Sequence, residues 1–285
     1  MKEVDIFKIG FGQVFLGIWN GKYVAIKKFN VKEKHNPKYS LNKFIKEINI
    51  ISNLRHPNVV LYMGASINKN DYYMISEYIP KGSLFDYIHV QKNKLNDLEL
   101  INLAYEVAVA VRYLHSRKIT HCDLKSSNIL LDENMKIKVS DFGLSRLKNV
   151  SSMAENKGRI GTPHWMPPEI MKAGKYEESS DVFSYGMILW ELLSGEIPYY
   201  GLNPNQIIGL VADCKKIVDV PKFGHVALRA LVKNCLIYEP EKRPTFDYII
   251  RYLDNVIQKS FNHGIYLLIR LYIGSNNHLY ILKKI

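Results

Sequence analysis

The polar residues with the clearest chemistry lie between positions 121 and 143. Two short apolar runs, at 129–131 and 137–139, flank a polar stretch, and this pattern predicts an antiparallel hairpin. Asn128 precedes the first run and Asp141 follows the second, so both side chains should lie at the open end of the hairpin. A carboxylate and an amide oxygen suit Mg²⁺, which takes few protein ligands and completes its shell with water and phosphate.

Two further charged side chains come just before the same hairpin. Asp123 and Lys125 precede its first strand by a few residues. They should bring a second carboxylate and a cation to the place where the metal is expected. This segment is therefore the first candidate for a reaction centre.

A second hairpin is predicted near the start of the chain. The runs at 14–19 and 22–27 are rich in β-formers and flank Asn20-Gly21, which is a strong signal for a tight turn. Gly10 and Gly12 stand just before this hairpin, where backbone amides without a neighbouring Cβ could approach a phosphate. The alternative for these two glycines is a simple turn.

One lysine and one glutamate in this half of the chain stand where burial is expected. Lys27 ends the apolar run 24–26, which should pack inward. Glu47 lies on the apolar stripe of a helix predicted over 41–54. A buried charge is costly unless it is paired, so Lys27 is the expected partner of Glu47. The alternative is a glutamate at the rim of the helix, in contact with water.

Two longer helices are predicted in the second half of the chain. Apolar residues recur every three or four positions over 97–115, which predicts an amphipathic helix that should pack beneath the loop carrying Asp123. Residues 181–193 are apolar nearly all round and indicate a buried helix. Asp181 stands at its expected start, where it can cap the helix.

The composition bounds the class of protein. The 285 residues, 47% hydrophobic and 23% charged, suffice for one large domain or two lobes and exclude a disordered chain. Three widely spaced cysteines form neither a zinc site nor a disulfide framework and indicate reduced thiols. A charged start and the lack of a run of roughly 20 apolar residues predict a soluble, cytoplasmic protein without membrane insertion. The net charge of +12 suits an anionic ligand, but no Cys/His finger or basic helix accompanies it, so nucleic-acid binding is not expected.

The order of these motifs resembles that of the eukaryotic protein kinases, specifically their tyrosine-kinase-like group of Raf and mixed-lineage type. The resemblance covers residues 9 to about 257, nearly nine tenths of the chain. The matching blocks, in the family's order, are Val24-Ala25-Ile26-Lys27, Glu47, 55–60, 121–128, Asp141-Phe142-Gly143, Gly161-Thr162-Pro163, Pro168-Glu169, 181–186 and Arg243-Pro244.

The resemblance implies an α+β fold with two lobes. Residues 1–79 would form a small β-rich N-lobe with one main helix, and residues 80–258 a larger helical C-lobe. Residues 259–285 have no counterpart in the family and could be a packed extension, a partner-binding strand or a translated non-coding stretch. Asp181 would also bond the backbone of the catalytic loop, and Glu169 and Arg243 would form a buried ion pair.

The resemblance also assigns roles in the transfer of phosphate from ATP. Lys27 would hold the α- and β-phosphates and be positioned by Glu47. Asp123 would be the catalytic base, and Lys125 would steady the γ-phosphate. The magnesium ligands would be Asn128 and Asp141.

A further set of residues would bind the rest of the nucleotide. Gly10 and Gly12 would lie over the phosphates. The adenine would lie between a roof and a floor and would be bonded by the backbone of a hinge. The implied residues are Val14 and Ala25 as the roof, Leu130 as the floor, Ser76 as the gatekeeper, and Glu77, Tyr78 and Ile79 as the hinge.

The function that follows is an ATP-dependent protein kinase that acts in signalling on protein substrates. Lys125 and Gly161-Thr162 favour serine or threonine as the acceptor, with tyrosine or dual specificity left open. The alternative is a pseudokinase scaffold that binds nucleotide or partners with little catalysis. No motif specifies the substrate or the oligomeric state.

Three departures from the family pattern bear on activity. The glycine loop, 9–14, is three residues short, so we expect weaker ATP binding or slower turnover. Cys122 replaces an arginine that in the family pairs with a phosphate on the activation loop, so activity should depend little on Ser151 and Ser152. Pro167 replaces an alanine and stiffens the chain.

Overall fold

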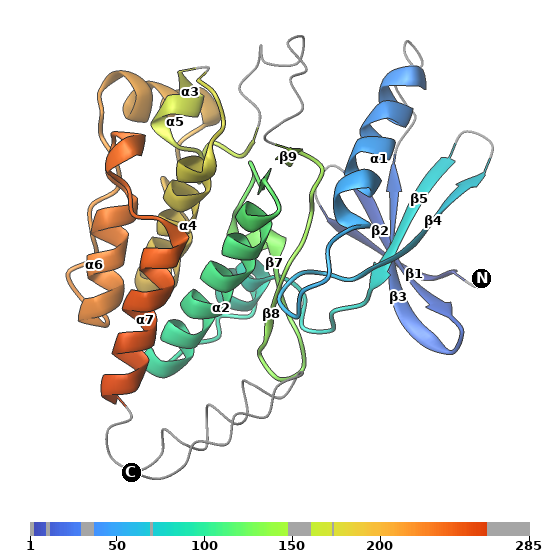
Figure 1. The fold of residues 1–285 in the computed structure, drawn as a ribbon, viewed down its shortest axis with the longest axis horizontal. Helices are drawn as coiled ribbons and strands as arrows, with labels where there is room; N and C mark the ends of the chain where they lie inside the picture. Colours follow the sequence, from blue (N-terminus) through green and yellow to red (C-terminus); the bar gives the residue numbers. More distant parts are fainter. Residues whose placement is uncertain are drawn as a thin grey trace.

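The computed structural model describes residues 3–9, 12–29, 37–68, 71–147, 161–172 and 174–260. Figure 1 shows a β-sheet with helix α1 on one side of the molecule, a larger helical part on the other, and the hairpin β7–β8 between them. This confirms the predicted α+β fold with a β-rich N-lobe and a helical C-lobe. In the part of the chain described here, no helix is both long enough and apolar enough to traverse a bilayer.

The sheet of the N-lobe has five strands in the spatial order β1-β2-β3-β5-β4, with antiparallel neighbours. The predicted turn joins β2 to β3: Asn20 and Gly21 have φ angles of 48° and 76°, and both residue types tolerate this left-handed region. The turn fixes the register that sets Lys27 opposite Val14. The strands are β1 (Glu3–Ile9), β2 (Gly12–Trp19), β3 (Lys22–Phe29), β4 (Tyr62–Asn68) and β5 (Asp71–Glu77).

Helix α1 (Pro37–Ile51) packs on this sheet through its predicted apolar stripe. Phe44 is 2% exposed and contacts Phe29 of β3 edge to face, with ring centroids 5.1 Å apart. It also stacks on Tyr72 of β5, with ring centroids 5.2 Å apart. Aromatic pairs of this kind add to the free energy gained from burial alone. The contacts fix how α1 is rotated against the sheet, and so they direct Glu47, three residues after Phe44, toward β3.

The C-lobe is built mainly from helices. Its long helices are α2 (Asp97–Ser116), α4 (Glu178–Ser194), α6 (Val226–Cys235) and α7 (Phe246–Ser260). Shorter helical pieces are η1 (Asp86–Val90), η2 (Ser126–Asn128), α3 (Pro168–Met171), α5 (Pro204–Ile208), η3 (Gly209–Asp213) and η4 (Pro240–Lys242). Two small antiparallel ladders pair β6 (Ile119–Thr120) with β9 (Arg146–Leu147), and β7 (Ile129–Leu131) with β8 (Ile137–Val139).

Helix α2 agrees with the prediction, whereas α4 begins three residues earlier than expected. Glu177 is the N-cap of α4 and shares a capping box with Ser180. The prediction that Asp181 caps the helix is therefore wrong. Residues 178–180 are polar, so they form the first turn without extending the apolar pattern that was used to locate the helix.

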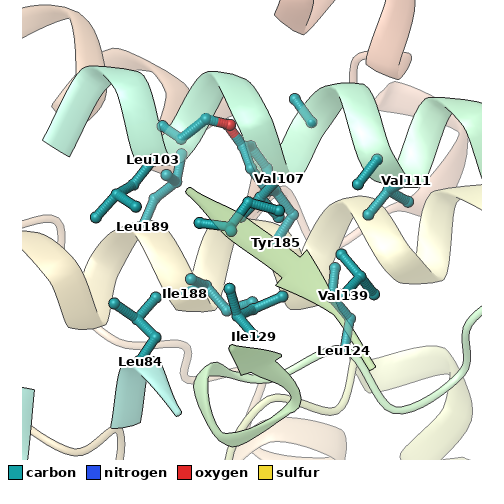
Figure 2. Packing of buried hydrophobic residues seen from close by; sticks show 14 of the residues in the cluster. Leu84, Leu103, Val107, Val111, Leu124, Ile129, Val139, Tyr185, Ile188 and Leu189 are labelled. Atoms are coloured by element: carbon teal, nitrogen blue, oxygen red, sulfur yellow. The ribbon is translucent and has the colours of Figure 1, made fainter. Parts of the chain in front are cut away.

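The hairpin lies against the core of the C-lobe. Figure 2 shows the apolar side chains of β7 and β8 facing those of α2 and α4. Tyr185, fully buried, donates a hydrogen bond from its hydroxyl to the carbonyl of Ala104 at 3.0 Å, which ties α4 to α2. The labelled members of this cluster are Leu84, Leu103, Val107, Val111, Leu124, Ile129, Val139, Tyr185, Ile188 and Leu189.

Backbone hydrogen bonds fix the hairpin on both of its outer edges. On one edge, Val60 donates to the carbonyl of Val139 at 3.0 Å, and Val139 donates to that of Asn58 at 2.9 Å. On the other edge, Leu131 donates to the carbonyl of Gly82 at 2.9 Å. The hairpin is thus held by the chain entering β4 and by the chain that follows β5, and its open end has a fixed position.

The last part of the chain is described only as far as Ser260, at the end of α7. The predicted lobe boundary after residue 79 falls between β5 and η1 and stays a prediction. The role of residues 261–285, which belong to the predicted tail, lies outside the described residues.

Candidate active site

Asn128 and Asp141 lie side by side at the open end of the hairpin, as predicted. Ile129 pairs with Val139, and Ser140 donates to the carbonyl of Asn128 at 2.9 Å, so Asp141 follows directly on the opposite strand. Asp141 has a φ of 60°, in the left-handed region that non-glycine residues seldom adopt. A residue keeps such a conformation only where the surrounding structure holds it, and Lys27 holds the side chain of Asp141 here.

Lys27 joins three separate segments through its ammonium group. The Nζ atom donates to Glu47 Oε1 at 2.8 Å and to Asp141 Oδ1 at 2.7 Å. Glu47 is 1% exposed, so the pairing predicted for it is confirmed and the alternative of a glutamate at the rim is wrong. The contact joins β3 and α1 of the N-lobe to the end of the C-lobe hairpin.

Asp141 and Lys27 keep each other charged. Burial alone would raise the pKa of Asp141, but the charge and the hydrogen bond of Lys27 outweigh it and hold this pKa at about 2. Burial alone would lower the pKa of Lys27, and the charges of Asp141 and Glu47 instead raise it above its ordinary value. Both groups therefore stay ionised throughout the physiological pH range.

Asp123 is held by Lys125 and Thr162. Its Oδ2 atom lies 2.8 Å from Lys125 Nζ, and its Oδ1 atom accepts from the backbone N–H and the hydroxyl of Thr162, both at 3.0 Å. Lys125 Nζ also donates to Thr162 Oγ1 at 2.7 Å. The nearby Asn128 donates through Nδ2 to the Asp123 carbonyl at 2.8 Å. The predicted base, cation and metal ligand are thus brought together.

Asp181 of α4 fixes the backbone of the loop that carries Asp123. This fully buried carboxylate accepts from the backbone N–H groups of His121 at 2.8 Å and Cys122 at 3.0 Å, as the resemblance implied. It also accepts from His115 Nε2 at 2.8 Å. Since an ionised carboxylate only accepts, this imidazole nitrogen must carry hydrogen.

Cys122 lies within this loop as a small buried side chain. Its Sγ atom points to the carbonyl of Thr120 at 3.4 Å, and the residue is 6% exposed. Burial raises the pKa of the thiol well above its usual range, so the group is neutral at physiological pH. Position 122 therefore supplies no charge for a phosphate, as its residue type predicted.

Most of the residues predicted to hold the adenine lie in strands, and the predicted hinge continues from the end of β5. Ala25 is opposite Ser76 in the β3–β5 ladder, Ile79 is 7% exposed, and Leu130 lies in β7. The side chain of Glu77 accepts from the Leu61 N–H and from Lys138 Nζ, each at 2.8 Å, so its carboxylate ties the hinge to neighbouring segments. The nucleotide roles of these residues, and of Val14 and Tyr78, stay predictions.

The predicted glycine loop is described in part. Ile9 pairs with Gly12, so only Gly10 and Phe11 connect β1 to β2. Gly10 lies outside the described residues. The effect of this short connection on ATP binding stays a prediction.

Sequence reasoning missed one acid that contacts the catalytic loop. Glu191 lies in α4, is 0% exposed and accepts from Ser126, the third residue after Asp123. The sequence pattern predicts a helix that is apolar nearly all round, and an acid within such a helix is the signal that points to Glu191.

Comparison with known proteins supports the assignment of the fold. The family described as "Protein tyrosine and serine/threonine kinase" matches residues 5–253. The chain is 38% identical over 264 residues to "Probable serine/threonine-protein kinase drkB" of Dictyostelium discoideum, covering 91% of this chain and 37% of the relative. It is 38% identical over 260 residues to "Serine/threonine-protein kinase CTR1" of Arabidopsis thaliana, covering 89% and 31%.

A third relative has a broader name. The chain is 38% identical over 249 residues to "Dual specificity protein kinase pyk3" of Dictyostelium discoideum, covering 87% of this chain and 18% of the relative. The chain therefore spans well under half the length of each of these three relatives.

Proposed function

The chain belongs to the protein tyrosine and serine/threonine kinase family, and from this premise we propose that it transfers the γ-phosphate of ATP to serine or threonine hydroxyls of protein substrates. The observation that carries the proposal is the contact of Lys27 with both Glu47 and Asp141, at 2.8 and 2.7 Å. The contact joins the cation that we propose for the phosphates to the carboxylate that we propose for the metal, and it links the N-lobe to the C-lobe hairpin.

The oxygen donors at the hairpin end fit a magnesium ion. Asn128 donates through Nδ2 to the Asp123 carbonyl, so its amide oxygen is the atom that would serve as a metal ligand. Asp141 is ionised and its side chain is 46% exposed, which leaves room for a ligand. Hard cations of this kind prefer such oxygen ligands, and bound magnesium would neutralise charge on the phosphates of ATP.

The chain's own residues would then promote an in-line displacement. The acceptor hydroxyl lies against Asp123, which takes its proton as the hydroxyl oxygen bonds to the γ-phosphorus. The bond from that phosphorus to the bridging oxygen breaks, and ADP leaves. Lys27 holds the α- and β-phosphates, and Lys125 offsets charge on the group in transit. The protein contributes position and electrostatics, because phosphoryl transfer requires little covalent work from it.

The contacts of Thr162 support a serine or threonine acceptor. Thr162 bonds Asp123 and Lys125 at 3.0 and 2.7 Å, so the segment that begins at Gly161 is held against the proposed base. The relatives drkB and CTR1 are named serine/threonine kinases, whereas pyk3 is named a dual-specificity kinase. We therefore keep dual specificity as the second candidate.

The pseudokinase alternative gains no support from these findings. Lys27, Asp123, Asn128 and Asp141 are all present: Lys27 contacts Asp141, and Asn128 contacts Asp123. The backbone bond from Ser140 to Asn128 holds the two pairs near each other. The shortened glycine loop bears on the rate and on the affinity for ATP. A cytoplasmic site of action, with soluble ATP and proteins as partners and without nucleic acid, completes the proposal.

Four peptides that differ only in the acceptor residue test this function. Serine, threonine, tyrosine and alanine occupy that position in turn, and transfer of label from γ-labelled Mg-ATP is measured for the purified chain. We expect transfer to serine and threonine, none to alanine, and none by Lys27→Met. Equal label on all four peptides, or equal activity of Lys27→Met, would refute the proposal. Transfer to tyrosine as well would establish dual specificity.

A further inference from the structure

Glu191 is a fully buried carboxylate that three donors reach at once. Oε1 lies 2.8 Å from His89 Nε2 and accepts from Ser126 Oγ at 2.6 Å, and Oε2 accepts from Trp165 Nε1 at 3.0 Å. Burying a carboxylate is costly unless such partners satisfy it. Bonds to a charged acceptor are also stronger than bonds between neutral groups. The acid therefore needs these donors, and they are held firmly by it.

The three donors come from three separate segments. His89 lies in η1, and its ring packs against Phe85 at 4.7 Å. Ser126 begins η2, the short helical turn that ends at Asn128. Trp165 comes from the segment after residue 161. A single side chain of α4 thus holds three segments that are far apart in sequence.

Two of these segments carry groups assigned to the reaction. Ser126 is the third residue after Asp123 and the second before Asn128, so its position limits how far either can move. The Trp165 backbone N–H donates to the carbonyl of Thr162 at 3.1 Å, and Ser184 of α4 donates to the carbonyl of Trp165 at 2.9 Å. The catalytic loop and the segment that contains Thr162 and Trp165 are therefore both fixed to α4.

His89 is the third partner of Glu191, and its Nε2 atom lies 2.8 Å from Oε1. Its side chain is 9% exposed, so the pair is well shielded from water. Because an ionised carboxylate only accepts, Nε2 of His89 must carry hydrogen in this contact.

We propose that Glu191, supported by His89, is a positioning residue for phosphoryl transfer. Through Ser126 it sets the catalytic loop that carries Asp123. Through Trp165 it sets the segment that receives the acceptor. The inference rests on the proposed kinase function. It adds that Oε1 positions the catalytic loop and Oε2 positions the segment that contains Trp165.

Two substitutions remove one donor each. Ser126→Ala does so with little change in shape, whereas Trp165→Phe also removes part of a buried ring system. Ser126→Ala deletes the hydroxyl that bonds Oε1, and Trp165→Phe deletes the N–H that bonds Oε2. We expect Ser126→Ala to lower kcat about tenfold, because a hydrogen bond to a charged group is lost on the side of the base. We expect Trp165→Phe to raise the KM for the acceptor peptide several-fold. The KM for ATP should stay within about twofold of wild type in both.

Tyr185→Phe is the matched control on the same helix. It removes a fully buried hydroxyl whose bond goes to Ala104 in the core, away from the site. It should lower stability and leave kcat and both KM values unchanged. If Glu191 had a merely structural role, Ser126→Ala and Trp165→Phe would behave like Tyr185→Phe, with lower stability and unchanged kcat and KM values.

Coupling provides a second readout. In a Glu191→Gln background the effect of Ser126→Ala on kcat should largely vanish, since the two changes act on one contact. Wild-type kcat in Ser126→Ala, or the same kinetic profile in Ser126→Ala and Trp165→Phe, would overturn the inference even if Glu191→Gln fails to fold. Absence of transfer by the wild-type chain would instead refute the proposed function, and the positioning role with it.

Discussion

Replacing Arg243 by lysine should destabilise the C-lobe strongly. The guanidinium is fully buried and forms a two-bond ion pair with Glu169, at 2.8 Å for each bond, which confirms the ion pair that the resemblance implied. It also donates to the carbonyls of Ile237 at 2.7 Å, Tyr238 at 2.9 Å and Ser179 at 2.9 Å. One side chain thus joins α3 to the start of α4 and to the turn before η4.

The expected loss follows from the number of donors. Arginine makes five bonds here, whereas lysine has three donors and no planar fork, so at least two bonds are lost. At about 1 to 1.5 kcal/mol for each lost bond, and more for the bond to the carboxylate, the cost is about 2 to 4 kcal/mol. In a domain of this size that corresponds to a fall in Tm of roughly 5 to 15 °C.

Urea unfolding followed by circular dichroism measures this cost. The matched control is Arg112→Lys, because Arg112 pairs with Asp247 at 2.6 Å but the two side chains are 56% and 62% exposed. An exposed pair contributes little, so the control should change stability by no more than about 0.5 kcal/mol. If Arg243→Lys proved as stable as Arg112→Lys, the assignment of a structural role to this buried ion pair would be refuted.

Three other predictions concern the site. Thr162→Val should lower label transfer about tenfold and Thr162→Ser should retain it, because the hydroxyl bonds the proposed base Asp123 and Lys125. Equal rates in the two variants would contradict this. The pKa of Asp141 is depressed, so the stability from its ionised pair with Lys27 is fully present above about pH 4 and is lost as the pH falls toward 2. Lys27→Met should reduce this loss of stability, measured as the difference between the urea midpoints at about pH 5 and about pH 3. A difference as large as that of the wild-type chain would argue against the pair. Ser151→Ala and Ser152→Ala should keep transfer within about twofold of wild type, since position 122 offers no charge to a loop phosphate, and a collapse of either would show a different dependence.

Local patterns predicted the parts of the site that depend on hairpins. The polar turn between two short apolar runs placed β7 and β8 at their observed residues, and with them Asn128 and Asp141. Asn20-Gly21 likewise fixed the register that brings Lys27 to its place in β3. In both cases the turn sets the pairing, so short-range sequence information is enough.

Contacts between distant segments could not be read in the same way. The burial of Glu47 depends on how α1 is rotated against the sheet, and the sequence left a rim position open. Glu191 was missed because its donors, His89, Ser126 and Trp165, lie 102, 65 and 26 residues away along the chain. Such contacts follow from packing, which a single sequence does not display.

The measurement that tests the central claim most directly is single-turnover transfer of the γ-phosphate at saturating Mg-ATP, with nucleotide binding recorded in parallel. Wild type should transfer the label, and Asp123→Asn should bind Mg-ATP normally but transfer at least about 100-fold more slowly, because it lacks the base. Asp141→Asn should lose transfer and weaken the dependence of binding on magnesium. Transfer by both variants at the wild-type rate would contradict the account.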